Sequence, residues 1–169
     1  MKNTNYIKAV FLCLIAMTVF SSCLKDKRYV DFKDVGATID FPAVAFSGPF
    51  QDITIAPSAS LVAYPVLVNV SVPNALSTPV NVGIKVDPAA LTAYNTKSGT
   101  AYTLMPTTAY TIPNLTVTVP ANQTSGTLTV NFNTAVIAQG DYVLPLTIAS
   151  TDQGTITQYK TILYHITIK

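Results

Sequence analysis

The chain has 169 residues, a length that suits one domain rather than several. All eight acidic residues are aspartates, tryptophan is absent, and ten lysines and arginines give a formal net charge of +2. Two of those lysines, Lys2 and Lys8, lie at the extreme N-terminus, so the rest of the chain is close to neutral. It has no basic stripe to neutralise phosphates, and we expect no nucleic-acid partner.

The N-terminus has the three regions of a secretory signal. Lys2 and Lys8 precede an apolar run of 12 residues at 9–20, and the small residues Ser21 and Ser22 follow it. A membrane-spanning helix needs about 20 apolar residues, because the hydrocarbon core is about 30 Å thick. We therefore predict a cleaved signal peptide at 1–22 rather than an uncleaved membrane anchor.

The next residues indicate lipid attachment. Ser21-Ser22-Cys23 resembles a bacterial lipobox, in which the cysteine becomes the first mature residue and carries acyl chains, although Phe20 stands where such motifs usually have leucine. Acyl chains contribute about 0.8 kcal/mol per buried methylene. The resemblance implies that Cys23 is the lipid attachment site and that the protein contacts a membrane through it. Cys13 would leave with the signal peptide, so we expect no disulfide.

Charge separates a tether from a domain. Seven charged residues lie between Leu24 and Asp34, whereas only nine follow in the remaining 135 residues. We predict a charged tether at 23–34 and a compact domain at 35–169.

Alternation of apolar and polar residues dominates that domain. Six runs have the period of two that is typical of strands with one buried face, and we place their apolar positions at 66–72, 80–86, 115–119, 128–132, 142–148 and 162–168. Weaker strand candidates lie at Tyr29–Phe32, Thr38–Phe41 and Asp52–Ile55. Turn residues separate the runs. The pattern predicts an all-β protein, an antiparallel sandwich of seven to nine short strands.

Two prolines modify this pattern. Asp87 can cap a helix and Pro88 fits its first position, so we predict one short helical segment of one or two turns that ends between Asn95 and Gly99. Pro145 lies inside a strong strand pattern and cannot donate a ladder hydrogen bond. We therefore expect that strand to lie at a sheet edge, or to be bulged at Pro145.

A series of residues resembles a known family. In chain order the series is Val86-Asp87, Leu91, Tyr94-Asn95, Tyr102, Leu104-Met105-Pro106, Tyr110 and Gly140–Ile148. It is similar to a Bacteroidetes domain of unknown function found at the N-terminus of surface lipoproteins, some of them related to family 18 glycoside hydrolases. The resemblance covers about 30–169 and implies an immunoglobulin-like sandwich, an outer-membrane location at the cell surface, and membership of glycan-utilisation loci. The sequence ends where larger members continue into a second domain, so the resemblance implies a stand-alone copy.

The sequence contains no recognisable catalytic motif. His165 is the only histidine, and no Gly-x-Ser-x-Gly motif accompanies it, so we expect it to be structural or solvent-facing. One histidine with no mature thiol cannot complete a zinc site. The domain aspartates are dispersed, which favours capping and turn roles over calcium binding or a paired glycosidase site, and we expect no enzyme, metal or cofactor. They are Asp40, Asp52, Asp87, Asp141 and Asp152.

Aromatic side chains are the candidates for ligand binding, because a tyrosine ring can stack on the face of a sugar while the tyrosine hydroxyl forms hydrogen bonds. Tyr142 and Tyr164 fall on inward faces, and Tyr94 and Tyr110 belong to the family framework. We therefore select the two rings that we expect to be exposed, Tyr102 and Tyr159.

Two functions remain open. The first is an outer-membrane lipoprotein whose β-sandwich is a binding module accessory to glycan capture or utilisation. The second is a structural or assembly lipoprotein that docks on a larger envelope protein complex, since edge strands invite docking by strand addition.

Overall fold

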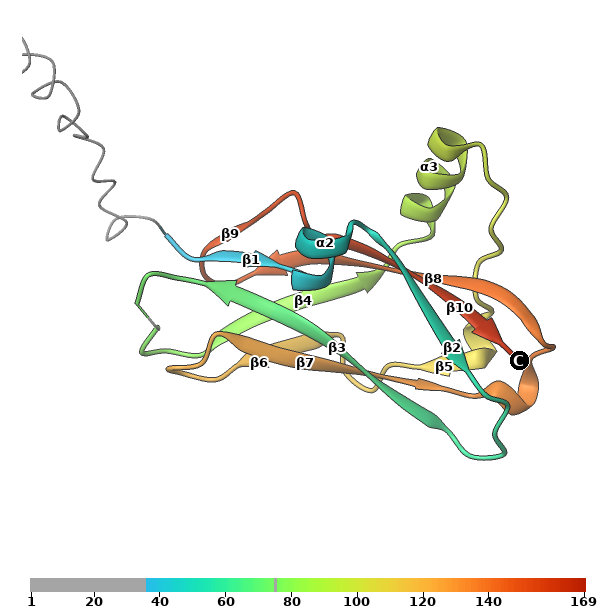
Figure 1. Cartoon of the computed structure of the whole chain (residues 1–169). Coiled ribbons are helices and arrows are strands. Elements are labelled where there is room, and N and C mark those ends of the chain that lie inside the picture. The colour runs from blue at the N-terminus through green and yellow to red at the C-terminus, as the bar shows by residue number, and fades with distance from the viewer. Residues whose placement is uncertain (1–35, 75) are drawn as a thin grey trace, which may run out of the picture. The chain divides into compact units, whose positions relative to one another are not determined.

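The structure, a computed structural model, describes residues 36–74 and 76–169. They form two five-stranded sheets that enclose one apolar core (Figure 1). The first sheet has the order β5-β7-β3-β1-β9, with bounds Tyr110–Thr111, Ser125–Phe132, Val62–Ser71, Thr38–Asp40 and Thr155–Ile156. The second has the order β2-β10-β8-β4-β6, with bounds Phe50–Ile55, Thr161–Ile168, Gly140–Thr151, Val80–Val86 and Thr116–Val119. The predicted all-β sandwich is confirmed.

Two details differ from the expectation, and several predictions lie outside the described residues. The described residues contain ten strands rather than seven to nine, because β5 and β9 have only two residues each. Two of the strand pairs are parallel, β1 with β9 and β2 with β10, so the sheets are not purely antiparallel. The predicted signal peptide, the tether, Cys23 and the weak strand Tyr29–Phe32 lie outside the described residues.

The apolar side of each predicted run faces the core. Val66, Val68 and Val70 in β3 are 1%, 0% and 1% exposed, and the corresponding positions of β4, β7 and β10 are also buried or nearly so. Leu115 is the exception, because it precedes β6 and is 43% exposed. The period-two pattern thus places the core correctly, and burial of these side chains is the main contribution to folding.

The described residues contain two α-helices rather than the single helical segment predicted, α2 (Pro42–Ser47) and α3 (Pro88–Ser98), and two short 3-10 turns, η3 (Thr107–Ala109) and η4 (Thr134–Val136). Helix α3 has 11 residues, longer than the predicted one or two turns. It ends at Gly99, whose left-handed φ of 66° suits glycine. Asp87 precedes the helix as predicted, but its carboxylate pairs with Lys85 Nζ at 3.1 Å instead of capping.

The expectation for Pro145 was wrong. Strand β8 lies between β10 and β4, and the register shift in its pairing with β4 lies between Gly83 and Ile84, away from Pro145. The proline is tolerated because β4 has ended beside it. The Asp87 N–H donates to the Pro145 carbonyl at 3.0 Å, so the proline nitrogen faces that same side, beyond the end of the β4 ladder.

Helix α3 packs against the outer face of the second sheet. Leu91 of α3 joins Val143 of β8 and Leu163 of β10 in a small apolar cluster separate from the main core. Phe50, Tyr94 and Tyr102 pack against this cluster. The middle of the second sheet is therefore covered on both faces, and the margin of the helix defines the site considered next. None of the described helices is long and apolar enough to span a membrane.

Candidate functional site

The site lies on the outer face of the second sheet, where β2, β10 and β8 run side by side. Strand pairing sets Asp52 opposite His165 and sets Asp141 opposite Thr167. These side chains share one face because strand residues alternate between faces, and their neighbours Tyr164 and Ile166 point into the core.

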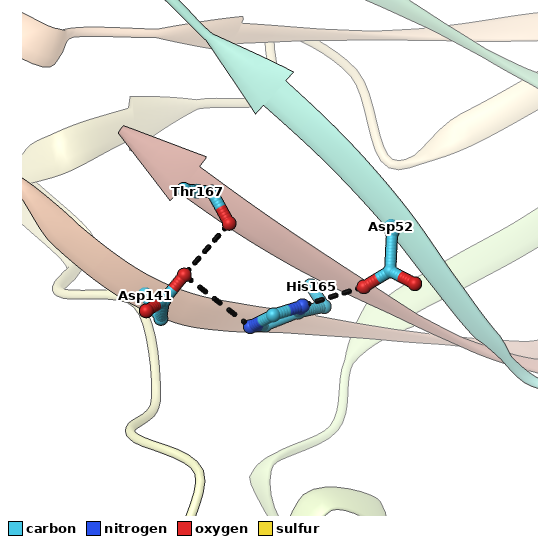
Figure 2. Close-up of polar contacts among 4 residues, drawn as sticks. All are labelled: Asp52, Asp141, His165 and Thr167. Atoms are coloured by element: carbon cyan, nitrogen blue, oxygen red, sulfur yellow. Dashed lines mark hydrogen bonds and ion pairs between the residues drawn. The ribbon is translucent and has the colours of Figure 1, made fainter. Parts of the chain in front are cut away.

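His165 connects two aspartates from different strands (Figure 2). Its Nδ1 lies 2.6 Å from Asp52 Oδ1, and its Nε2 lies 3.6 Å from Asp141 Oδ1. Thr167 Oγ1 donates to the same Asp141 oxygen at 2.7 Å. A carboxylate only accepts hydrogen bonds, so the proton between His165 and Asp52 belongs on Nδ1. Nε2 is buried and has no hydrogen-bond partner among the described residues.

The carboxylates face solvent although the histidine does not. The side chain of His165 is 16% exposed, whereas those of Asp52 and Asp141 are 79% and 60% exposed. Each carboxylate has its Oδ1 atom engaged by a neighbouring side chain, and its Oδ2 atom has no bond to any described residue. The site therefore presents two accessible acceptor oxygens whose side chains are held in place from the sheet.

Aromatic rings form one side of the site. The Phe50 ring lies 5.1 Å from that of Tyr94, 4.8 Å from that of Tyr102 and 5.2 Å from the His165 ring, measured between centroids. Tyr102 lies 5.1 Å from the His165 ring. These spacings are those of stabilising aromatic pairs. All three aromatic residues are half-buried, so this aromatic wall both holds α3 on the sheet and borders the carboxylates.

Asn95 explains why the family series contains Tyr-Asn. Its Nδ2 donates to the Tyr102 carbonyl at 3.0 Å, and its Oδ1 accepts from the Tyr102 N–H at 3.2 Å and from Thr100 Oγ1 at 2.9 Å. The amide thus fastens the segment after α3 to the last turn of the helix. Through this segment it positions the Tyr102 ring.

The structure separates the two predicted candidate rings. Tyr102 was expected to be exposed, and that was wrong, because its ring packs against Phe50 in the aromatic wall and is half-buried. Tyr159 lies between β9 and β10, is 38% exposed, and its carbonyl accepts a backbone bond from the Phe41 N–H at 3.1 Å. Tyr159 is therefore exposed as predicted but contributes nothing to this site. Tyr164 is buried in the core as expected, and there burial raises its phenol pKa above the ordinary value.

Sequence reasoning did not find the carboxylate pair. Asp52 and Asp141 were expected in capping or turn roles, and that was wrong, because both lie in strands and contact His165. His165 was expected to be structural or solvent-facing, and it is a covered link between strands. The one indication in the sequence was that alternation along the last strand places His165 and Thr167 on the face away from the core. Recognising their partners required the parallel pairing of β2 with β10.

The arrangement offers acceptor oxygens beside aromatic surface. Within the described ranges, no three histidine, cysteine or acidic side chains are grouped so as to hold a metal ion. Fixed carboxylates next to rings are suited to a ligand that carries several hydroxyl or amino groups on an apolar frame.

Comparison with known proteins agrees with the fold. A multidomain protein from Bacteroides ovatus that includes DUF1735 matches over 79% of this chain and 45% of its own, at 24% identity and a TM-score of 0.62. A candidate carbohydrate binding protein from Bacteroides ovatus matches at 15% identity and a TM-score of 0.58, over 77% of this chain and 36% of its own.

A third structure is EndoBT-3987 of Bacteroides thetaiotamicron, with a Man5GlcNAc product. It matches at 20% identity and a TM-score of 0.53, over 70% of this chain and 28% of its own. The chain therefore spans less than half the length of each of these three proteins, and at these identities they establish the fold alone. No curated protein sequence matches the chain.

The sequence also matches a protein-family model. The model, for an N-terminal domain, matches residues 41–155, which include every part of the series from Val86 to Ile148. The solved structures with this fold include several from Bacteroides species. The chain therefore belongs to the Bacteroidetes family of N-terminal domains of unknown function that its motifs resemble.

Proposed function

We propose that this protein is a lipid-anchored outer-membrane protein whose sandwich binds glycans and assists their capture or utilisation at the cell surface. The carboxylates of Asp52 and Asp141 are the observation that carries this proposal. They are exposed, held from the sheet by His165 and Thr167, and bordered by the aromatic wall. Sugar hydroxyls donate to such oxygens, and the C–H face of a sugar packs on such rings.

Two structures with the same fold also support glycan binding. One structure of this fold is a candidate carbohydrate binding protein and another carries a glycan product, although both are longer than this chain. Because a fold hosts many functions, the proposal depends on the site rather than on these likenesses.

A glycan array screened with the soluble 35–169 fragment tests this function. We expect binding that is lost in Tyr102→Ala and retained in Tyr159→Ala. These two substitutions are matched in size, but only Tyr102 lies beside His165. A folded fragment that binds nothing on the array, or that binds equally well after Tyr102→Ala, would count against the site.

The anchor needs its own test. We expect labelled fatty acid to be incorporated into the protein and to be absent from Cys23→Ala, because the acyl chains would attach at that cysteine. Protease added to intact cells should digest the protein if the domain faces outward. Normal labelling of Cys23→Ala would refute lipid attachment at Cys23.

Docking on an envelope complex is the second candidate, and a groove favours it. Strands β6 and β7 follow one another but belong to different sheets, and they line a groove of about 410 Å³ that includes Thr116, Thr118, Thr127 and Thr129. The Ile84 N–H donates to the Leu115 carbonyl, so by alternation the Thr118 N–H points to the free edge of the second sheet.

Cross-linking in membranes tests this second candidate. If a partner adds a strand at this edge, Thr118→Pro should abolish the cross-link while leaving the β4–β6 backbone ladder intact, because the lost N–H points outward. The proline also removes the bond from the Thr118 hydroxyl to Asn81, so Thr118→Ala is the control that should keep the cross-link. Recovery of the protein alone from cross-linked membranes would dismiss docking as its function.

A further inference from the structure

We propose that the outer-face site takes neutral or amine-bearing sugars and rejects glycans that carry carboxylate or sulfate groups. This inference depends on the proposed glycan-binding function and specifies the ligand class of the same site. It follows from which hydrogen-bonding groups the site offers and from the charges that surround it.

The free polar atoms of the site are acceptors. Asp52 and Asp141 each keep Oδ2 unbonded, whereas their Oδ1 atoms are engaged by His165 Nδ1 and Thr167 Oγ1. An ionised carboxylate cannot donate. A ligand must therefore bring donors, and hydroxyl, amine and acetamide groups do so. Uronate and sulfate groups are themselves acceptors, so neither their oxygens nor the aspartate Oδ2 atoms would gain a hydrogen bond.

The basic side chains His165 and Lys85 are already engaged by aspartates. The two ring nitrogens of His165 are directed at Asp52 Oδ1 and Asp141 Oδ1, and its Nε2 is buried. Lys85 pairs with Asp87 at 3.1 Å. Over residues 36–74 and 76–169, no lysine or arginine lies within salt-bridge distance of Asp52 or Asp141. An arriving anion would therefore meet two exposed carboxylates that no lysine or arginine of the described residues neutralises by direct pairing. Lys169 follows β10 two residues beyond Thr167 and makes no ion pair with Asp141.

Exposure makes this selection dependent on salt. Both carboxylates are more than half exposed, so their field reaches a ligand through water and is screened over about 8 Å at physiological ionic strength. The preference should accordingly be large in dilute buffer and should shrink as salt is added. A preference that came from shape alone would not respond to salt.

Two matched pairs of oligosaccharides test the proposal on the purified full chain by calorimetric titration. The first pair is β-1,4-linked mannose and mannuronate tetramers, which differ by a carboxylate on each sugar. The second pair is glucosamine and N-acetylglucosamine tetramers, in which each nitrogen is either an amine that can carry a positive charge or a neutral acetamide. At low salt we expect the anionic tetramer to bind about tenfold more weakly than its neutral partner, and the amine to bind about tenfold more tightly than the acetamide.

Two variants assign the effect to the site. Asp52→Asn and Asp141→Asn should each narrow both differences, whereas Asp152→Asn, at an exposed turn where the carboxylate bonds Asn81, should leave them unchanged. Equal binding of mannose and mannuronate tetramers would overturn the selectivity and leave the proposed function standing. If no tetramer binds and the array is also silent, the glycan function and the selectivity both fail.

Discussion

The hydrogen bond between His165 and Asp52 joins two side chains that are 113 residues apart in sequence. The histidine is largely covered, whereas the carboxylate of Asp52 is exposed. A hydrogen-bonded pair whose acidic partner is 79% exposed contributes little to folding, between zero and about 1 kcal/mol, because water screens it. Its larger effect is to restrict the rotamers of Asp52. The residue therefore matters more for the site than for the stability of the fold.

Replacing His165 by phenylalanine separates these two effects. The variant keeps a ring that can pack on Phe50 and Tyr102 but removes the bond to Asp52. We expect the free energy of unfolding, measured in urea, to change by less than about 1 kcal/mol, while glycan affinity falls because Asp52 is no longer held. A loss of stability above about 2 kcal/mol would show that the pair is structural.

Asp40 gives a pH-dependent prediction. This side chain at the end of β1 is 9% exposed, and burial raises the pKa of its carboxyl, with a bond from Asn69 opposing the shift. The folded state therefore holds the proton more tightly than the unfolded chain, and stability decreases as pH rises through the folded pKa. Asp40→Asn removes this cost, so it should gain up to about 1 kcal/mol at pH 7.

The same variant should show no gain at pH 3, where Asp40 is protonated in both states. Urea unfolding at the two pH values measures the difference. If Asp40→Asn were less stable than the parent protein at pH 7, the bond from Asn69 would outweigh desolvation, and the argument from burial would be wrong.

At the scale of elements, α3 determines where the site lies. The run Val143-Leu144-Pro145-Leu146 is buried on both faces of β8, and such a run is typical of a strand covered on each side. Alternation within it directs Leu144 and Leu146 to the core and leaves Val143 for Leu91 of the helix. The helix was predictable from Asp87-Pro88, but its packing on the outer face was not, because the sequence of α3 has no amphipathic pattern.

Asn95→Ala tests the link between α3 and the aromatic wall. The amide makes three bonds that fasten Thr100 and Tyr102 to the helix. We expect the variant to lose about 1–2 kcal/mol of stability and to show faster amide exchange over 95–105 than elsewhere. Thr96→Ala, whose hydroxyl only bonds within the helix, is the matched control. Uniform acceleration of exchange over the whole domain would mean that α3 does not open by itself.

For the whole molecule, the six alternating runs were enough to predict the sandwich, since each places a buried face in a strand. The pairing of the N-terminal strands was not predictable, because parallel neighbours are far apart in sequence and leave no local signal. The carboxylate site depends on that pairing, since Asp52 meets His165 only when β2 lies beside β10. Tyr102 was predicted as a candidate from its residue type. The carboxylates of Asp52 and Asp141 near it could be recognised only from the three-dimensional structure.

The N- and C-terminal parts of the domain are in close contact at Gly154. Its φ is +78°, and a Cβ there would lie 2.6 Å from the Ala37 carbonyl oxygen and 2.7 Å from Ile39 Cδ1. Gly154→Ala should therefore cost about 2–4 kcal/mol of unfolding free energy, more than conformational strain alone. Gly99→Ala, at φ +66° with open space around it, should cost only about 1 kcal/mol. Equal losses in thermal or urea unfolding would contradict the close contact.

The parallel edge pairs also determine when the domain can fold. Strand β2 has a single neighbour, β10, so it has no hydrogen-bonding partner until residues 161–168 have been made. A nascent chain therefore cannot complete its second sheet before those residues have left the ribosomal exit tunnel.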